Sequence, residues 1–244
     1  MSLDVVAAIA AWSYPAARMI LRALGIRASN HPRLAALADA VRDPYERVEA
    51  FDCDYAQGPD HWLYTTNPIE RERHQVALRL LDSARADTSF GRVFEVACAE
   101  GVFTEMIAPL CESLAAVDFS EIALNRARQR CDWGNRVVFR QWNLRTDPIP
   151  GPFDVIVVMD VLSTIRRPGR LRKVIEKLVA GLRSGDLLLV GDYREGKLLE
   201  DSWLGKRLLF GGKWVVQEVA THPALATVEK ASTETHVFAL LRRS

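Results

Sequence analysis

The chain has 244 residues, of which 49% are hydrophobic and 26% charged, and its formal net charge is +1 at pH 7. This composition is typical of a globular α/β protein and excludes a disordered chain. With so little net charge, no global field favours nucleic acid, and we expect no nucleic-acid partner. The four cysteines form no C-x-x-C pair, so we expect free thiols, no metal site and a reducing, cytoplasmic location.

Residues 1–66 show no strand-like alternation and are expected to form an N-terminal helical extension or lid, broken at prolines such as Pro15 and Pro32. The apolar stretch near the start is interrupted by Arg18, and it is far shorter than the roughly 20 residues that a membrane span needs. We therefore expect no membrane span. An amphipathic helix packed on the domain is favoured, and a helix on a membrane surface or a dimer contact through these helices stays open as an alternative.

The main domain is expected at 67–244, where the sequence changes character. A helix is predicted from Pro68, because Asn67 suits the N-cap and proline suits the first helical position. Beyond it, short apolar runs alternate with helical segments. The predicted strands are 93–97, 114–117, 137–139, 155–159, 187–190, 225–230 and 236–241. The predicted helices are 103–110, 121–130, 171–182 and 214–220.

Strands that alternate with helices of about ten residues indicate βαβ units and a parallel sheet covered on both faces. Right-handed crossovers then give a doubly wound, Rossmann-like sheet. The last two strands follow each other through a short polar turn, so they should form an antiparallel hairpin. The expected fold is α/β, with a mostly parallel sheet and an antiparallel C-terminal hairpin.

The segment 93–104 reads as a buried strand that opens directly into a helix. Its turn carries the small residues Ala97, Ala99 and Gly101, so the backbone can approach a ligand closely. The N-terminus of the next helix adds free N–H groups and a favourable dipole for anions. A tight strand-to-helix turn without a ligand explains the same residues equally well.

Polar residues also stand at the ends of later strands. Asp118 can accept hydrogen bonds from two ribose hydroxyls, and Phe119 beside it offers a face to adenine. Asn143 can bond the edge of adenine, and Asp160 follows the fourth strand. Each alone is explained as a helix cap or turn residue. Together, at the ligand-binding edge of an open α/β sheet, they indicate a nucleoside-containing ligand.

The sequence E-V-A-C-A-E-G-V-F-T resembles motif I of class I S-adenosylmethionine (SAM)-dependent methyltransferases, written (E/D)-x-G-x-G-x-G. A-V-D-F-S resembles their second-strand acidic motif, and F-D-V-I-V-V-M-D-V-L their fourth-strand motif. The resemblance covers about residues 70–242 and implies a seven-stranded sheet, SAM as cofactor and S-adenosylhomocysteine (SAH) as product. The chain departs from the motif at Ala97 and Ala99, which replace glycines and are tolerable if their φ angles stay negative.

The resemblance also assigns contacts. Asp118 would bind the ribose, Asn143 with Leu144 would lie at the adenine, and Arg73 would pair with the methionine carboxylate under a cover formed with Trp62 and Tyr64. The complete set of expected cofactor-binding residues is Tyr64, Arg73, Glu95, Ala97, Cys98, Ala99, Gly101, Asp118, Phe119, Asn143, Leu144 and Asp160.

More narrowly, the chain is similar to the nodulation protein S family of N-methyltransferases, through D-P-Y-E-R at 43–47, H-W-L-Y-T-T-N-P-I-E-R-E-R at 61–73 and C-A-E-G-V-F-T-E-M-I-A-P-L-C from Cys98. That family methylates an amine on a deacetylated chitin-like oligosaccharide. The resemblance thus implies N-methylation of a small-molecule acceptor, most simply a sugar amine. The alternatives are an O-methyltransferase for a sugar or natural-product hydroxyl, and a SAM-binding relative without catalysis. A nicotinamide-dependent dehydrogenase is disfavoured because its glycine pattern is missing.

A neutral amine needs no strong base during attack, only prior deprotonation. Asp160 is therefore the expected catalytic residue, holding the amine and accepting its proton. Most of the histidines are expected to be structural, with His222 and His236 left open as alternative bases. Acceptor recognition is expected in 40–66 and in the long segment 192–213.

Overall fold

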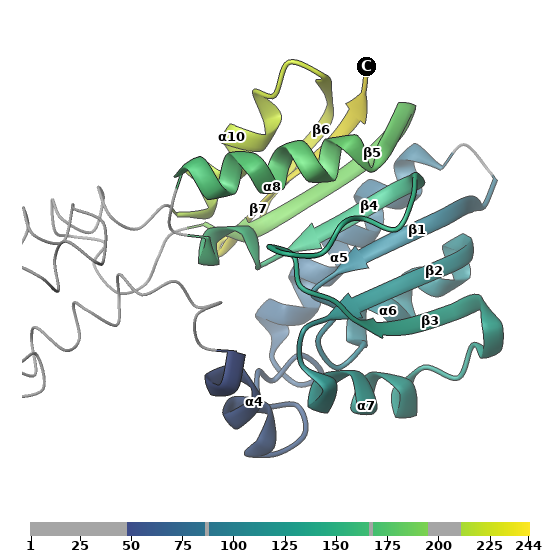
Figure 1. The fold of residues 1–244 in the computed structure, drawn as a ribbon, viewed down its shortest axis with the longest axis vertical. Helices are drawn as coiled ribbons and strands as arrows, with labels where there is room; N and C mark the ends of the chain where they lie inside the picture. Colours follow the sequence, from purple (N-terminus) through teal and green to yellow (C-terminus); the bar gives the residue numbers. More distant parts are fainter. Residues whose placement is uncertain (1–47, 86–87, 166–167, 195–210) are drawn as a thin grey trace, which may run out of the picture.

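The computed structural model describes residues 48–85, 88–165, 168–194 and 211–244, which form a seven-stranded sheet with helices on both faces (Figure 1). The strands are β1 (Phe90–Val96), β2 (Cys111–Asp118), β3 (Val137–Gln141), β4 (Phe153–Met159), β5 (Leu182–Tyr193), β6 (Leu225–Ser232) and β7 (His236–Arg243). The helices are α4 (Val48–Ala56), α5 (Pro68–Ala84), α6 (Val102–Ile107), α7 (Glu121–Arg130), α8 (Pro168–Ala180) and α10 (Gly212–Ala220).

The strand order is β3-β2-β1-β4-β5-β7-β6. Strands β1 to β5 pair in parallel, whereas β7 runs antiparallel to both of its neighbours, β5 and β6. This arrangement confirms the predicted fold, including the C-terminal hairpin. It adds that β7, although later in the chain than β6, lies inside the sheet next to β5.

Strand β4 shows why the central strands read as unbroken apolar runs. Val155 and Val157 pack on one side of the sheet with α5 and α6, while Ile156 and Val158 pack on the other with α8 and α10. Successive side chains of a strand point to opposite faces, so a strand covered on both faces has no polar side. In Figure 1, α8 lies in front of the sheet and α5 and α6 lie behind it.

Helix α5 begins where the sequence predicts. The Asn67 side chain accepts a hydrogen bond from the N–H of Ile69 at 3.0 Å, and Pro68 occupies the first helical position. Its buried residues lie three or four positions apart, and so they form one stripe against the sheet. These buried residues are Arg73, His74, Val76, Ala77, Leu80 and Leu81. Two of them are polar and lie in its N-terminal half, near the carboxyl ends of the parallel strands.

The described part of the leading segment, 48–66, is attached to the domain by polar contacts. The Ser120 hydroxyl donates to Asp52 at 2.6 Å, which joins α4 to the start of α7. Glu100 is buried, accepts a hydrogen bond from the N–H of Asp60 at 2.7 Å and pairs with Arg126. Arg126 also donates to the carbonyl of Gly58 at 2.7 Å. The segment is thereby held beside the carboxyl ends of β1 and β2.

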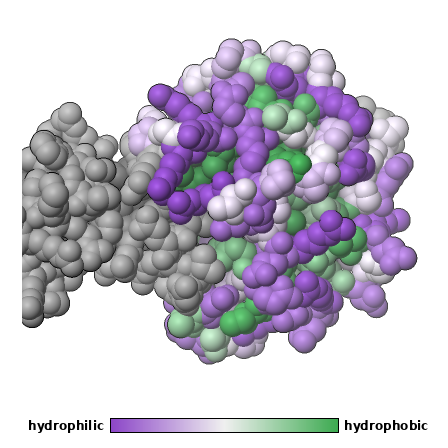
Figure 2. All heavy atoms as spheres, viewed as in Figure 1, coloured by the Kyte–Doolittle hydropathy of each residue, from purple (hydrophilic) through white to green (hydrophobic). Residues whose placement is uncertain are grey.

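The face seen in Figure 2 is largely covered by hydrophilic residues, with apolar ones in scattered areas. Among the described residues, Trp62 and Leu63 are neighbouring large apolar side chains that are both exposed, at 40% and 54%. No helix within the described ranges is long and apolar enough to cross a membrane. Of this pair in the leading segment, Trp62 lines the cavity described next.

Candidate functional site

A cavity of about 310 Å³ lies at the carboxyl ends of β1, β2, β4 and β5, where β7 begins. This volume is within the range of small-molecule sites. Nine of the twelve expected cofactor-binding residues line it. They are Tyr64, Arg73, Glu95, Ala97, Cys98, Ala99, Asp118, Phe119 and Asp160. Trp62, expected to help cover the cofactor, also lines the cavity.

The turn after β1 brings backbone to the cavity in an unexpected conformation. Ala97 has φ +59° and Ala99 has φ +49°, so both lie in the left-handed region that favours glycine. The condition stated for tolerating these alanines, a negative φ, is therefore not met. The left-handed conformation costs a non-glycine residue roughly 1 kcal/mol. The turn therefore has a backbone conformation that glycine adopts without strain, and the two alanines adopt it at this energetic cost.

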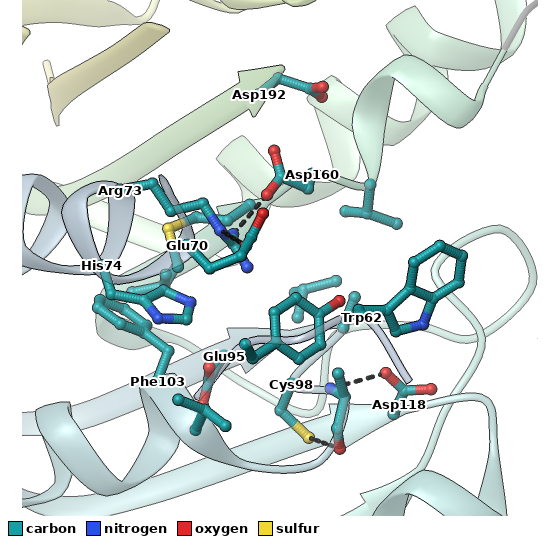
Figure 3. A pocket seen from close by; sticks show the side chains of 18 of the residues that line it. Trp62, Glu70, Arg73, His74, Glu95, Cys98, Phe103, Asp118, Asp160 and Asp192 are labelled. Carbon is teal, nitrogen blue, oxygen red and sulfur yellow. Dashed lines mark hydrogen bonds and ion pairs between the residues drawn. The ribbon is translucent and has the colours of Figure 1, made fainter. Parts of the chain in front are cut away.

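Asp118 is the last residue of β2, and its carboxylate connects the end of this strand to the turn after β1. One carboxylate oxygen accepts a hydrogen bond from the N–H of Ala99 at 3.0 Å (Figure 3). The other accepts one from the N–H of Ser120 at 2.9 Å. Burial raises the pKa of Asp118 to about 6, although these backbone hydrogen bonds oppose the shift. A buried carboxylate fixed in this way can present its remaining lone pairs to hydroxyl groups in the cavity.

Three expected residues are not brought to the cavity. Gly101, with φ +78°, precedes α6, and a Cβ there would lie 3.0 Å from Cβ of Ala127, so this glycine serves helix packing. The side-chain oxygen of Asn143 accepts from the N–H of Arg145 at 2.9 Å within its own loop. Leu144 is buried in the core. For Asn143, the turn-residue interpretation matches the observed contact.

Arg73 is the centre of a buried ionic cluster. Its guanidinium pairs with Glu70, one turn earlier on α5, and with Asp160 after β4, as Figure 3 shows. The guanidinium carbon also lies 5.3 Å from the centre of the Tyr64 ring. Burial favours the neutral form of Asp160, but Arg73, followed by His236, lowers the pKa of this carboxyl below its ordinary value. Asp160 is thus held ionised at the edge of the cavity.

Glu95, on β1, is buried beneath the cavity. The hydroxyl of Thr104 donates to it at 2.6 Å. Burial raises the pKa of Glu95 to about 8, against the effect of the Thr104 hydrogen bond. Near neutral pH this side chain therefore tends to keep its proton, and it can donate as well as accept a hydrogen bond.

The pKa of Glu95 predicts a pH-dependent stability. Between about pH 4.5 and 8 the native state holds a proton that the unfolded state releases, so this residue lowers stability as pH rises. Glu95→Gln removes this titration. We therefore expect the melting temperature of the variant minus that of wild type to be larger at pH 8 than at pH 5. Thermal unfolding without ligand measures this. Glu112→Gln, on an exposed position of β2, is the control. A difference for Glu95→Gln that is constant with pH contradicts the prediction.

Several residues that line the cavity were not expected as cofactor contacts. Tyr55 from α4 is 5% exposed and lies near Asp118, whose charge raises the pKa of the phenol further after burial has done so. Asp192 and Tyr193 end β5, and His236 begins β7. Asp192 lies near the carboxyl end of β5, after the apolar run 187–190, so a signal for it was present in the sequence. No local sequence pattern indicated that Tyr55 would line the cavity.

Part of the expected acceptor region lies outside the described residues. Within 192–213, positions 195–210 fall there, as do residues 40–47 of the leading segment. In the described remainder of that region, the residues that line the cavity are Tyr55, Trp62, Tyr64, Asp192 and Tyr193; Ser163 and Thr164, outside it, line the cavity as well. The described ranges contain no group of three or more His, Cys, Asp or Glu side chains arranged to hold a metal ion.

The sheet order, the antiparallel final strand and an acid at the end of β2 define a class I methyltransferase fold. Within that class, the chain belongs to the nodulation protein S (NodS) family, whose family model matches residues 50–232. NodS of Bradyrhizobium diazoefficiens is 33% identical over 136 residues, which are 56% of this chain and 64% of that protein. NodS of Sinorhizobium fredii is 33% identical over 132 residues, 54% of this chain and 60% of that protein.

A solved structure gives the same result for the fold. The crystal structure of the N-methyltransferase NodS from Bradyrhizobium japonicum WM9 in complex with SAH has a TM-score of 0.67 and 27% identity. The match covers 83% of this chain and 99% of that one. The resemblance stated from the sequence motifs is thereby confirmed at the level of the family. The chain spans less than two thirds of the length of the two relatives from B. diazoefficiens and S. fredii.

Proposed function

We propose that this chain is a SAM-dependent methyltransferase that methylates a small-molecule amine, most specifically an amine of a sugar or oligosaccharide. The observation that carries the proposal is Asp118, which is buried at the end of β2 and bonded to the backbone of the turn after β1. This geometry supports binding of an adenosyl group through its ribose hydroxyls. Membership of the NodS family supports the choice of an amine acceptor.

The residues around the cavity fit the parts of SAM by their chemistry. Asp118 suits the ribose, Phe119 offers an apolar face for adenine, and Arg73 carries the positive charge that the methionine carboxylate requires. When bound, SAM supplies a methyl group already activated by its sulfonium. The protein then has to orient the acceptor and exclude water. We also propose that 1–66 acts as an extension covering 67–244, with Tyr55, Trp62 and Tyr64 over the cofactor.

Asp160 is proposed as the residue that holds the acceptor amine. Its carboxyl is kept ionised by Arg73, and it lines the cavity at the end of β4. An ionised carboxylate attracts an ammonium group and orients the neutral amine through an N–H hydrogen bond. A hydroxyl acceptor gains less from such a group, because it needs a stronger base to lose its proton.

Binding and product analysis test the proposal. We expect calorimetry to detect SAM and SAH binding but no NADH binding. With SAM, mass spectrometry should find one added methyl group on a chitin oligosaccharide with a free terminal amine, and none on the fully N-acetylated oligosaccharide. Methylation of both oligosaccharides would instead support the O-methyltransferase alternative. SAH binding without methylation of amino sugars, phenols or hydroxy sugars would support a non-catalytic relative.

A further inference from the structure

Asp160 and His236 meet at the cavity although they are distant in the sequence. Asp160 follows β4, and His236 is the first residue of β7. The Nε2 atom of His236 lies 3.4 Å from Oδ1 of Asp160, which is long for a hydrogen bond. This Oδ1 atom is buried and has no hydrogen-bond partner among the described residues. Both residues line the cavity.

The imidazole of His236 is held in place by its surroundings. Its Nδ1 atom lies 2.8 Å from the hydroxyl of Thr235, and its ring packs edge-on against Tyr193 with centroids 5.0 Å apart. The backbone N–H of His236 donates to the hydroxyl of Thr233 at 2.9 Å. If Nδ1–H donates to Thr235, the neutral ring leaves Nε2 as an acceptor.

The other charged groups around His236 leave it the best-suited proton acceptor. Arg73 on α5 pairs with Asp160, and Asp160 is held ionised by it, so this carboxyl binds a proton poorly. His74, also on α5, is buried, and burial and then Arg73 lower its pKa to about 3. On β5, burial and then Asp160 raise the pKa of Asp192 to about 7. Both oxygens of Asp192 already accept backbone N–H groups, from Ser163 and from Tyr193.

We propose that Asp160 Oδ1 and His236 Nε2 together bind the two N–H groups of a primary amine, and that His236 removes the proton that frees the amine for attack. This inference rests on the proposed methyltransferase function. The ammonium gives one proton to Nε2, which becomes an imidazolium beside ionised Asp160. The nitrogen lone pair then forms the N–C bond, the S–C bond breaks, and its electron pair stays on sulfur. The product is a methylammonium, and His236 later releases its proton to water.

His236→Gln tests this assignment, because glutamine can still accept a hydrogen bond but cannot take the proton. We expect kcat with a chitin oligosaccharide bearing a free terminal amine to fall roughly 10- to 100-fold near neutral pH. The loss should shrink as pH rises, because a larger fraction of the bound amine is then already neutral. The SAH dissociation constant should stay within about twofold of wild type.

A matched control is His222→Gln. His222 is also largely buried and lies 3.2 Å from a carboxylate, that of Glu176, but it does not line the cavity. We expect this variant to keep the wild-type pH profile. Thr235→Val is a second variant, which removes the hydroxyl that orients His236. It should give a smaller loss of kcat with the same recovery at high pH, even if His236→Gln folds poorly.

Two outcomes would overturn the inference. One is an unchanged pH profile of kcat for both His236→Gln and Thr235→Val. The other is a loss of the same size at every pH, which indicates a structural role for the histidine. If wild type methylates amines and either outcome is found, only the role of His236 fails. If wild type binds SAH but methylates no amine, the proposed acceptor class fails, and the inference fails with it.

Discussion

Replacing Asp118 by alanine is expected to weaken SAH binding about 100-fold, which corresponds to roughly 2.7 kcal/mol. Two effects add. The variant loses a buried, charged acceptor for the ribose hydroxyls, and it releases the N–H of Ala99, which Asp118 fixes at 3.0 Å. The turn after β1 already holds two alanines at positive φ, so losing this hydrogen bond also removes one of its constraints. Isothermal calorimetry with SAH measures the change.

The control for Asp118→Ala is Asp154→Ala. Asp154 also accepts a backbone N–H from a neighbouring strand, that of Arg92 at 2.5 Å, but at the opposite end of the sheet and away from the cavity. We expect it to affect stability and to leave the SAH dissociation constant nearly unchanged. Wild-type affinity in folded Asp118→Ala would contradict the assignment of this acid to the ribose.

Replacing Arg73 by methionine is expected to lower the free energy of unfolding by about 3 kcal/mol. The Arg73 side chain is only 6% exposed and pairs with both Glu70 and Asp160. Methionine fills much of the same space but leaves the two carboxylates close together without a cation. Their repulsion and poor solvation then oppose folding. Urea unfolding of the ligand-free protein measures the loss.

Helix α5 supplies a matched control. Arg85 pairs with Asp82 at the same spacing of three residues, but these side chains are 28% and 58% exposed. Exposed pairs contribute little, so Arg85→Met should change the free energy of unfolding by less than about 0.5 kcal/mol. Equal effects of the two substitutions would show that burial of the Arg73 cluster adds nothing to stability.

The fold was predictable because strand ends and helix starts have local signatures. The apolar runs of β1, β4 and β5 are covered on both faces, so they contain few polar residues and stand out in the sequence. Asp118 and Asp160 were found because each directly follows an apolar run, 114–117 for Asp118 and 155–159 for Asp160. Parallel strands then bring their carboxyl ends to one edge of the sheet.

The conformation of connecting segments was not predictable in the same way. Asn143 lies in the loop after β3, where a contact far along the chain fixes the backbone: Lys177 on α8 donates to the carbonyl of Asp147 at 2.7 Å. No residue near Asn143 indicates that contact. The left-handed alanines were missed for a related reason, because the strain at Ala97 and Ala99 is maintained by tertiary contacts such as that of Asp118.

The register of β7 decided the position of His236. His236 lies opposite Tyr193 because β7 pairs antiparallel with β5. This pairing joins segments that are more than 40 residues apart in the sequence. A histidine that begins a strand carries no local sign of its neighbours across the sheet. Its role as a base was therefore left open on sequence grounds, and the structure brings it to Asp160.

The interior position of β7 has a consequence for how the molecule is made. During synthesis, β6 emerges before β7 but can join the sheet only through it, and β5 keeps one unpaired edge until 236–243 has left the ribosome. Exposed strand edges invite pairing with other chains. Nascent protein halted between β6 and β7 should thus be prone to aggregate. Completion of this late hairpin covers the exposed edge of β5 and brings His236 next to Asp160.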